Sequence, residues 1–152
     1  MTTRYLLGAD ALLELCAAGD TPTSIWARSI RLADCRLSVV AVGIAQEVIQ
    51  HELATDLARQ RGWTRSLRAR LAEIERLGVP RLHVTEEVVE TWIALRRHPL
   101  AALDAQGNKI GASQDTRLVI ATASCHGLTL AEPAQPYHAT LQELGIQVQS
   151  LA

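Results

Sequence analysis

Residues 118–130 read Leu-Val-Ile-Ala-Thr-Ala-Ser-Cys-His-Gly-Leu-Thr-Leu and predict a helix that is followed closely by a strand. The apolar residues up to Ala123 fit the buried side of a helix that Ser113 can cap. Gly127 is suited to end this helix, because glycine readily adopts the left-handed conformation that often follows one. The short apolar run 128–130 is typical of a buried strand.

Four further segments have the same short apolar character, and we expect strands at 5–7, 37–42, 81–84 and 146–148. Segments with helical spacing of Leu, Ile and Val separate them. This alternation predicts an α/β fold in which about five parallel strands form one sheet with helices on both faces. The carboxyl ends of parallel strands meet at one edge, where α/β proteins place their sites.

Several residues predict where the helices begin and end. Asp10 is expected to cap the first helix, and Pro22, preceded by Thr21, to start the second. Gly43 is expected to turn the chain into a long helix, and Gly62 to end it. Further helices are expected to open at Thr64 and at Thr85, and a short one to occupy 99–105, before a loop at 107–111.

Composition limits the class of protein. A length of 152 residues suits one domain, spanning 1–152. The net charge of −1 does not favour a nucleic-acid or membrane partner on bulk charge alone. Three cysteines that form no Cys-x-x-Cys pair indicate buried free thiols in a reducing cytosol. Neither a secretory signal nor a membrane-spanning run is visible, so we expect a cytoplasmic protein.

Three stretches resemble the PIN-domain family, in particular the VapC and FitB toxins. Residues 5–15, Tyr-Leu-Leu-Gly-Ala-Asp-Ala-Leu-Leu-Glu-Leu, are similar to the family opening Leu-Leu-Asp-Thr-Asn-Val-Leu. Residues 37–44 resemble a segment that ends in Ala-Glu in the family. Residues 107–112 and 118–130 resemble the family run Gly-x-x-Ile, Asp-x-x-Ile-Ala-Ala-Thr-Ala and His-Gly-Leu-Thr-Leu. The resemblance implies a three-layer PIN-like sandwich.

PIN domains cut RNA with Mg²⁺ or Mn²⁺, which requires several carboxylates in one cleft, because Mg²⁺ prefers a shell of oxygen ligands. The four family acids fall here on positions that carry no carboxylate: Gly8, Ile44, Thr116 and Ala134. The resemblance therefore predicts a site that holds no metal in the family manner.

Four acids near these positions offer an alternative site: Asp10, Glu47, Asp115 and Glu132. If they converged, they could bind Mg²⁺ or Mn²⁺ and restore catalysis. Geometry argues against this, since one helical step rotates a side chain by about 100° and three steps move it by about 4.5 Å along the axis. Helix capping, the helix dipole and solvent exposure explain the same acids equally well.

The predicted middle helices carry a cluster of arginines. Arg61, Arg65 and Arg68 are candidates for contacting RNA phosphates, with Trp63 as a stacking group. A solvated helical hairpin, in which Glu73 and nearby acids pair with arginines, explains the same pattern.

Three interpretations of function remain open. The chain is a toxin-family protein with weak or no ribonuclease activity that retains binding of a protein partner or RNA. Alternatively, it is an active Mg²⁺- or Mn²⁺-dependent endoribonuclease that uses the relocated acids, or a module that only binds other proteins. The resemblance implies a homodimer and a small DNA-binding antitoxin as partner, although a cleft without the family acids would attract an antitoxin arginine less strongly.

Overall fold

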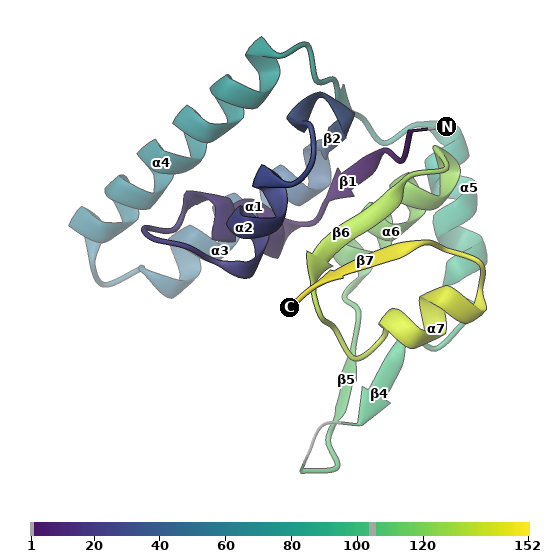
Figure 1. Cartoon of the computed structure of the whole chain (residues 1–152). Helices are drawn as coiled ribbons and strands as arrows, with labels where there is room; N and C mark the ends of the chain where they lie inside the picture. The colour runs from purple at the N-terminus through teal and green to yellow at the C-terminus, as the bar shows by residue number, and fades with distance from the viewer. Residues whose placement is uncertain (1, 104–105) are drawn as a thin grey trace.

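A five-stranded parallel sheet lies at the centre of the computed structural model, which describes residues 2–103 and 106–152 (Figure 1). Its strand order is β3-β2-β1-β6-β7. The strands are β1 (Tyr5–Leu7), β2 (Cys35–Ser38), β3 (Arg81–Leu82), β6 (Thr129–Pro133) and β7 (Val148–Leu151). The predicted α/β class with about five parallel strands is confirmed.

Helices cover both faces of this sheet (Figure 1). In the view of Figure 1, α2 lies in front of the sheet and contacts β6 and β7, while α5 and α6 pack against each other behind it. The helices are α1 (Ala9–Cys16), α2 (Pro22–Arg28), α3 (Val39–Glu52), α4 (Leu57–Arg76), α5 (Glu86–Leu95), α6 (Gln114–Cys125) and α7 (His138–Glu143), with a short 3-10 helix at Leu32–Asp34.

Aliphatic side chains from the central strands form the core. Leu6 of β1, Leu37 of β2 and Leu130 of β6 are completely buried, and Leu6 and Leu130 are direct neighbours in the register. Burying a side chain of this size contributes about 1.5–3 kcal/mol relative to leaving it exposed. The central position of β1 therefore fixes Gly8, the residue after it, at the carboxyl edge of the sheet.

Four of the expected helix signals are confirmed. Thr21, Thr85 and Ser113 each accept a hydrogen bond from the first turn of the helix that follows, as capping residues do. Gly127 has a φ of 63°, in the left-handed region that favours glycine, and it follows the end of α6. Asp10, however, lies inside the first turn of α1, and Gly8 occupies the capping position, so the prediction of an Asp10 cap was wrong.

The strand expected at 37–42 is shorter than predicted. β2 ends at Ser38, whose hydroxyl accepts hydrogen bonds from the amides of Val40 and Ala41 and so begins α3. The β-branched run that favoured a strand thus forms the first turn of α3, and Gly43 lies inside that helix instead of before it. A local side-chain cap here outweighs the strand preference of valine.

The boundary expected between the two middle helices was also misplaced. Gly62 and Thr64 both lie inside α4, and the break comes earlier, between Leu53 and Asp56. The Asp56 side chain accepts a hydrogen bond from the amide of Arg59 and caps α4. A single exposed glycine did not end a helix whose buried side runs through Leu67 and beyond.

Strands, not a helix, follow α5. β4 (Ala101–Leu103) and β5 (Lys109–Gly111) form an antiparallel hairpin that projects from the body in Figure 1. The short helix expected at 99–105 is therefore wrong over 101–103, and its last two residues lie outside the described part of the chain. The adjacent loop expected at 107–111 forms the second strand from Lys109 onward.

All three cysteines are free thiols, as expected. Cys35 is buried, whereas Cys16 and Cys125 are only partly buried, so full burial was predicted correctly for one of the three. Burial raises the pKa of the Cys35 thiol to about 11, which keeps it protonated at neutral pH.

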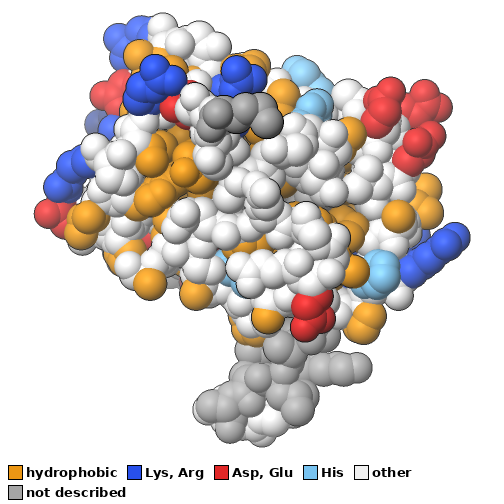
Figure 2. All heavy atoms as spheres, turned by 45° about the vertical axis from the view of Figure 1, so that its right-hand side comes forward, with side chains coloured by type: hydrophobic (Ala, Val, Ile, Leu, Met, Phe, Trp, Pro, Cys, Tyr) orange, Lys and Arg blue, Asp and Glu red, His pale blue; other side chains and the backbone are white. Residues whose placement is uncertain are grey.

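The outer surface does not carry one dominant charge. Figure 2 shows acidic and basic side chains in separate small groups on the face it presents, with hydrophobic side chains between them. None of the helices in residues 2–103 and 106–152 combines the length and the apolar character that crossing a membrane requires.

Replacing Gly62 with alanine tests the position of the helix boundary. A Cβ atom on Gly62 would meet no other atom within 4 Å, and Gly62 is exposed in the interior of α4. Gly62→Ala should therefore raise the free energy of unfolding by about 0.5–1 kcal/mol in urea titrations. Gly127→Ala is the matched control and should be destabilising, because its φ of 63° disfavours alanine. A destabilised Gly62→Ala variant would instead place a turn there.

Candidate functional site

A cleft of about 230 Å³ lies at the carboxyl edge of the sheet, where parallel α/β folds place their sites. Asp10 of α1, Ile44 of α3, Thr116 of α6 and Glu132 of β6 contribute to its walls. Segments far apart in the sequence meet here because β1 and β6 are neighbouring strands and α3 packs against α1 and α6.

Glu132, which lines this cleft, lies close to Gly8. Gly8 follows β1, and Glu132 lies one residue further along β6 than Ala131, the register partner of Leu7. A Cβ atom on Gly8 would lie 2.7 Å from Oε2 of Glu132 and 3.0 Å from its Cβ. The φ of Gly8 is −71°, which any residue adopts, so the neighbouring side chain and not the backbone requires glycine here.

Glu132 belongs to a buried polar network. Its Oε1 accepts hydrogen bonds from the Tyr137 hydroxyl at 3.0 Å and from Nε2 of His138 at 2.7 Å. His138 Nδ1 lies 2.8 Å from the Ser150 hydroxyl and accepts a hydrogen bond from the Gln135 amide at 3.3 Å. These bonds assign the imidazole proton to Nε2. Glu132 and His138 are each only 6% exposed, so pairing is what makes their burial tolerable.

Tyr137 remains a donor within this network. Burial, the charge of Glu132, the hydrogen bond to Glu132 and the charge of Asp10, in that order, raise the pKa of the Tyr137 phenol. The phenol therefore stays protonated at neutral pH and keeps donating to the carboxylate.

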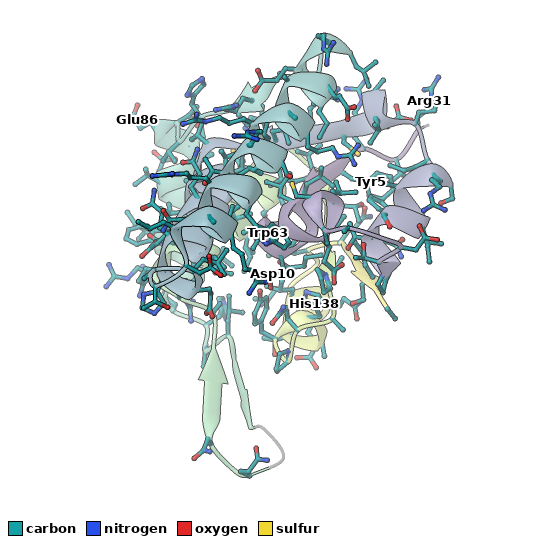
Figure 3. The ribbon with its side chains drawn as sticks, turned by 90° about the vertical axis from the view of Figure 1, so that its left-hand side faces the viewer. Tyr5, Asp10, Arg31, Trp63, Glu86 and His138 are labelled. Carbon is teal, nitrogen blue, oxygen red and sulfur yellow. The ribbon has the colours of Figure 1, made fainter. Side chains whose placement is uncertain are left out.

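Asp10 is the second carboxylate of the cleft. Its Oδ2 accepts a hydrogen bond from the Gln135 side chain at 3.3 Å, which links it to the loop before α7. Figure 3 shows Asp10 and His138 on the same side of the molecule. Partial burial, then the charge of Glu132, then that of Glu14, raise the pKa of Asp10 above its ordinary 3.8. Asp10 and Glu132 both line the cleft.

The other two relocated acids do not join them. Glu47 and Asp115 are exposed on α3 and α6, and neither lines the cleft. Across residues 2–103 and 106–152, no three His, Cys, Asp or Glu side chains gather where a metal ion could be held. The four-acid cluster that was considered as an alternative is thus not formed, as the helical offsets of Glu47 and Asp115 indicated.

The donor set of the cleft does not fit Mg²⁺ or Mn²⁺ in the family manner. Mg²⁺ demands near-octahedral oxygen coordination, usually with several carboxylates or phosphates converging. Asp10 and Glu132 supply two carboxylates, and Oε1 of Glu132 is already bound to Tyr137 and His138. No catalytic step through a metal can be derived from these residues.

The four positions that match the family acids differ in whether they line the cleft. Ile44 and Thr116 are half-buried and line the cleft. Gly8 is buried against Glu132 and does not line the cleft, and Ala134 is exposed and does not line it either. Two of the four positions therefore line the site, and neither carries a carboxylate.

The arginines predicted to bind RNA share one groove. Arg61, Arg65 and Arg68 of α4, together with Gln50 of α3, line a depression of about 420 Å³. Within the described part of the chain, these three arginines form no ion pair, whereas Arg70 pairs with Glu73. Trp63 packs partly against the core, so it is not free to stack on a base.

Sequence reasoning missed the polar network around Glu132. A signal was present, because Leu128, Leu130 and Glu132 alternate along β6, which directs all three side chains to the same face of the sheet. Tyr137, His138 and Ser150 carried no comparable pattern. Their convergence depends on the turn before α7 and on the pairing of β6 with β7.

The parallel sheet, its strand order and the cleft at its carboxyl edge define the PIN-domain class of α/β fold, and solved structures support this assignment. The chain has the fold of the FitB and VapC toxins, as predicted. FitAcB from Neisseria gonorrhoeae matches at a TM-score of 0.65 and 21% identity, over 95% of each chain. No protein-family model and no curated protein matches the sequence.

Two further structures extend this similarity. VapBC2 from Rickettsia felis, bound to a DNA fragment from its promoter, matches at a TM-score of 0.68 and 12% identity, over 99% of this chain and 100% of that one. VapC20 from Mycobacterium tuberculosis, a sarcin-ricin loop cleaving toxin, matches at a TM-score of 0.62 and 16% identity, over 90% of this chain and 94% of that one. Several of the matched structures are toxin–antitoxin complexes.

The raised pKa of Asp10 predicts how stability depends on pH. An acid whose pKa is higher in the folded state binds its proton more tightly there than in the unfolded chain. Its contribution to stability is therefore fully present below pH 3.8 and is lost as the pH rises through the pKa of the folded state. Asp10→Asn should therefore be more stable than the wild type at pH 7, and this gain should vanish below pH 3.8 in urea titrations.

Carboxyl NMR titration supplies the control for this prediction. Glu132→Gln should lower the pKa of Asp10, and Glu14→Gln should lower it less, following the order of the two charges. An Asp10 pKa that stays the same in Glu132→Gln would contradict the proximity of the two cleft acids.

Proposed function

We propose that this chain is a PIN-domain protein of the toxin–antitoxin type that binds a protein partner or RNA and cleaves RNA weakly or not at all. One observation carries the proposal: two positions of the family acids line the cleft as Ile44 and Thr116, and a third is Gly8, packed against Glu132. Efficient phosphodiester cleavage by a metal requires carboxylates at these places. Their replacement favours binding over catalysis.

The remaining acids support a binding role. The Asp10 carboxylate faces the cleft and can accept a guanidinium, which forms charge-assisted hydrogen bonds with carboxylates. Glu132 lies behind it and adds negative charge to the same wall. A partner that inserts one basic side chain would fit a cleft of this size and negative charge.

The solved neighbours suggest the class of partner. FitAB and VapBC structures contain an antitoxin, and several are bound to DNA. By analogy, we propose that this chain forms a homodimer in the cytoplasm and pairs with a small DNA-binding antitoxin.

An active Mg²⁺- or Mn²⁺-dependent endoribonuclease is the second candidate. The Oε2 of Glu132 lies where the side chain of an acid at position 8 would begin, so β6 delivers a carboxylate that β1 lacks. Such a site would depend on Asp10 and Glu132 rather than on Glu47 and Asp115. A module that binds only proteins is the third candidate.

Incubation with RNA separates these candidates. We expect the purified protein to cleave RNA no faster with Mg²⁺ or Mn²⁺ than with a chelator, and Asp10→Ala to change nothing. Cleavage that a chelator stops, and that Asp10→Ala and Glu132→Gln abolish while the exposed control Glu47→Ala does not, would overturn the proposal and support the second candidate. Calorimetric titration with Mn²⁺ should show no tight site in the wild type.

Salt dependence tests the arginine groove. If single-stranded RNA binds Arg61, Arg65 and Arg68, the triple Gln variant should reduce the slope of log K against log salt by about 2, since each phosphate contact contributes about 0.7. Fluorescence anisotropy with a labelled RNA measures this slope. Arg59→Gln, an exposed arginine of α4 outside the groove, should leave most of the slope intact. Absence of RNA binding by the wild type would favour the module that binds only proteins.

A further inference from the structure

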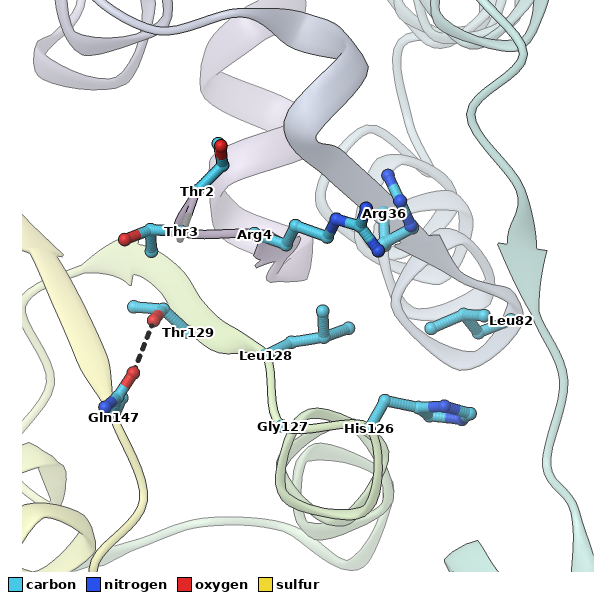
Figure 4. A pocket seen from close by; sticks show the side chains of 10 residues that line it. All are labelled: Thr2, Thr3, Arg4, Arg36, Leu82, His126, Gly127, Leu128, Thr129 and Gln147. Atoms are coloured by element: carbon cyan, nitrogen blue, oxygen red, sulfur yellow. Dashed lines mark hydrogen bonds between the residues drawn. The ribbon is translucent and has the colours of Figure 1, made fainter.

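A second and larger cavity, of about 800 Å³, lies at the amino-terminal edge of the sheet, opposite to the cleft (Figure 4). Its walls come from the residues that precede or begin β1, β2, β6 and β7, and from the end of α6. The cavity shares no lining residue with the cleft.

Two arginines, Arg4 and Arg36, stand on the face of the sheet that also carries the buried Leu6. Arg36 is the register partner of Leu6, and Arg4 precedes Leu6 by two residues, so both side chains leave the sheet on the side of Leu6. A parallel sheet normally covers this side with aliphatic residues. In Figure 4 the Arg4 side chain extends toward Arg36, which brings two positive charges to one cavity.

No carboxylate balances these charges in the described part of the chain. Neither Arg4 nor Arg36 forms an ion pair there, and the residues that line the cavity include no Asp or Glu. Nη1 of Arg36 donates to the carbonyl oxygens of Ala33 and Cys35, at 3.0 and 2.8 Å. These bonds orient the guanidinium without neutralising it. Such a half-buried charge favours an anionic ligand.

Further polar groups complete the lining. Thr2, Thr3 and Thr129 contribute hydroxyls, and His126 follows α6 at the rim. The Thr129 hydroxyl donates to Gln147 at 3.1 Å, which joins the starts of β6 and β7. Glu87 of α5 does interact with His126, but its lowered pKa comes first from its own backbone amide and then from Thr85.

We propose that this cavity binds the phosphate of a ligand the size of a mononucleotide. Guanidinium groups match phosphate oxygens in two-point contacts, and threonine hydroxyls donate to the same oxygens. Leu82 and Leu128 supply an apolar wall for a base. The volume falls within the range of about 300–1,000 Å³ that is usual for small-molecule sites. The proposal is independent of any activity at the cleft.

Calorimetric titration of the full chain with AMP, adenosine and inorganic phosphate tests the site. We expect AMP to bind, phosphate to bind more weakly, and adenosine not to bind measurably. Arg36→Gln and Arg4→Gln should each weaken AMP binding about tenfold or more, as loss of a charge-assisted contact does. Arg59→Gln, an exposed arginine far from the lining set, should leave AMP affinity unchanged.

Two sources of the phosphate can be distinguished in the same experiment. A short RNA with a 5′-phosphate that binds more tightly than AMP would identify a strand end as the ligand, whereas equal affinity would identify a free nucleotide. Circular dichroism confirms that each variant is folded, and the exposed position of Arg4 makes its variant the safer one. Equal affinities for AMP and adenosine, or wild-type AMP affinity in a folded Arg4→Gln, would overturn the proposal.

Discussion

The contact between Glu132 and Gly8 constrains the whole carboxyl edge of the sheet. Two neighbouring parallel strands end here, and there is room for one side chain where two would meet. Because Glu132 occupies that space, residue 8 cannot carry a side chain unless Glu132 moves. The carboxylate next to position 8 therefore comes from β6, where it accepts hydrogen bonds from Tyr137 and His138.

The hydrogen bonds from Tyr137 and His138 change what the Glu132 carboxylate can do. Ser150, His138 and Glu132 follow one another at hydrogen-bond distance, an order that hydrolases use to activate a hydroxyl. Here Nδ1 of His138 also accepts a hydrogen bond from the Gln135 amide, and Ser150 does not line the cleft. The network thus holds α7 against β6 and β7, and the buried charge stabilises one arrangement of the edge.

The sequence sufficed for the parts that depend on local chemistry. The caps at Thr21, Thr85 and Ser113 and the glycine at 127 act on residues three or four positions away, and all were predictable. The strand expected at 37–42 was too long, because Ser38 ends β2 and caps the helix that follows. The burial of Glu132 could not be predicted, because it depends on partners that only strand pairing brings together. Helix geometry alone, by contrast, already indicated that Glu47 and Asp115 would not converge with the other two acids.

The two edges of the sheet carry opposite charges. Asp10 and Glu132 make the carboxyl edge negative, while Arg4 and Arg36 make the amino edge positive. A net charge of −1 conceals this separation, because the two groups cancel in the sum. The residues of one edge place no direct constraint on those of the other, since Leu6, Leu37 and Leu130 of the strands between them are completely buried. A phosphate site at the amino edge is therefore compatible with any chemistry at the carboxyl edge.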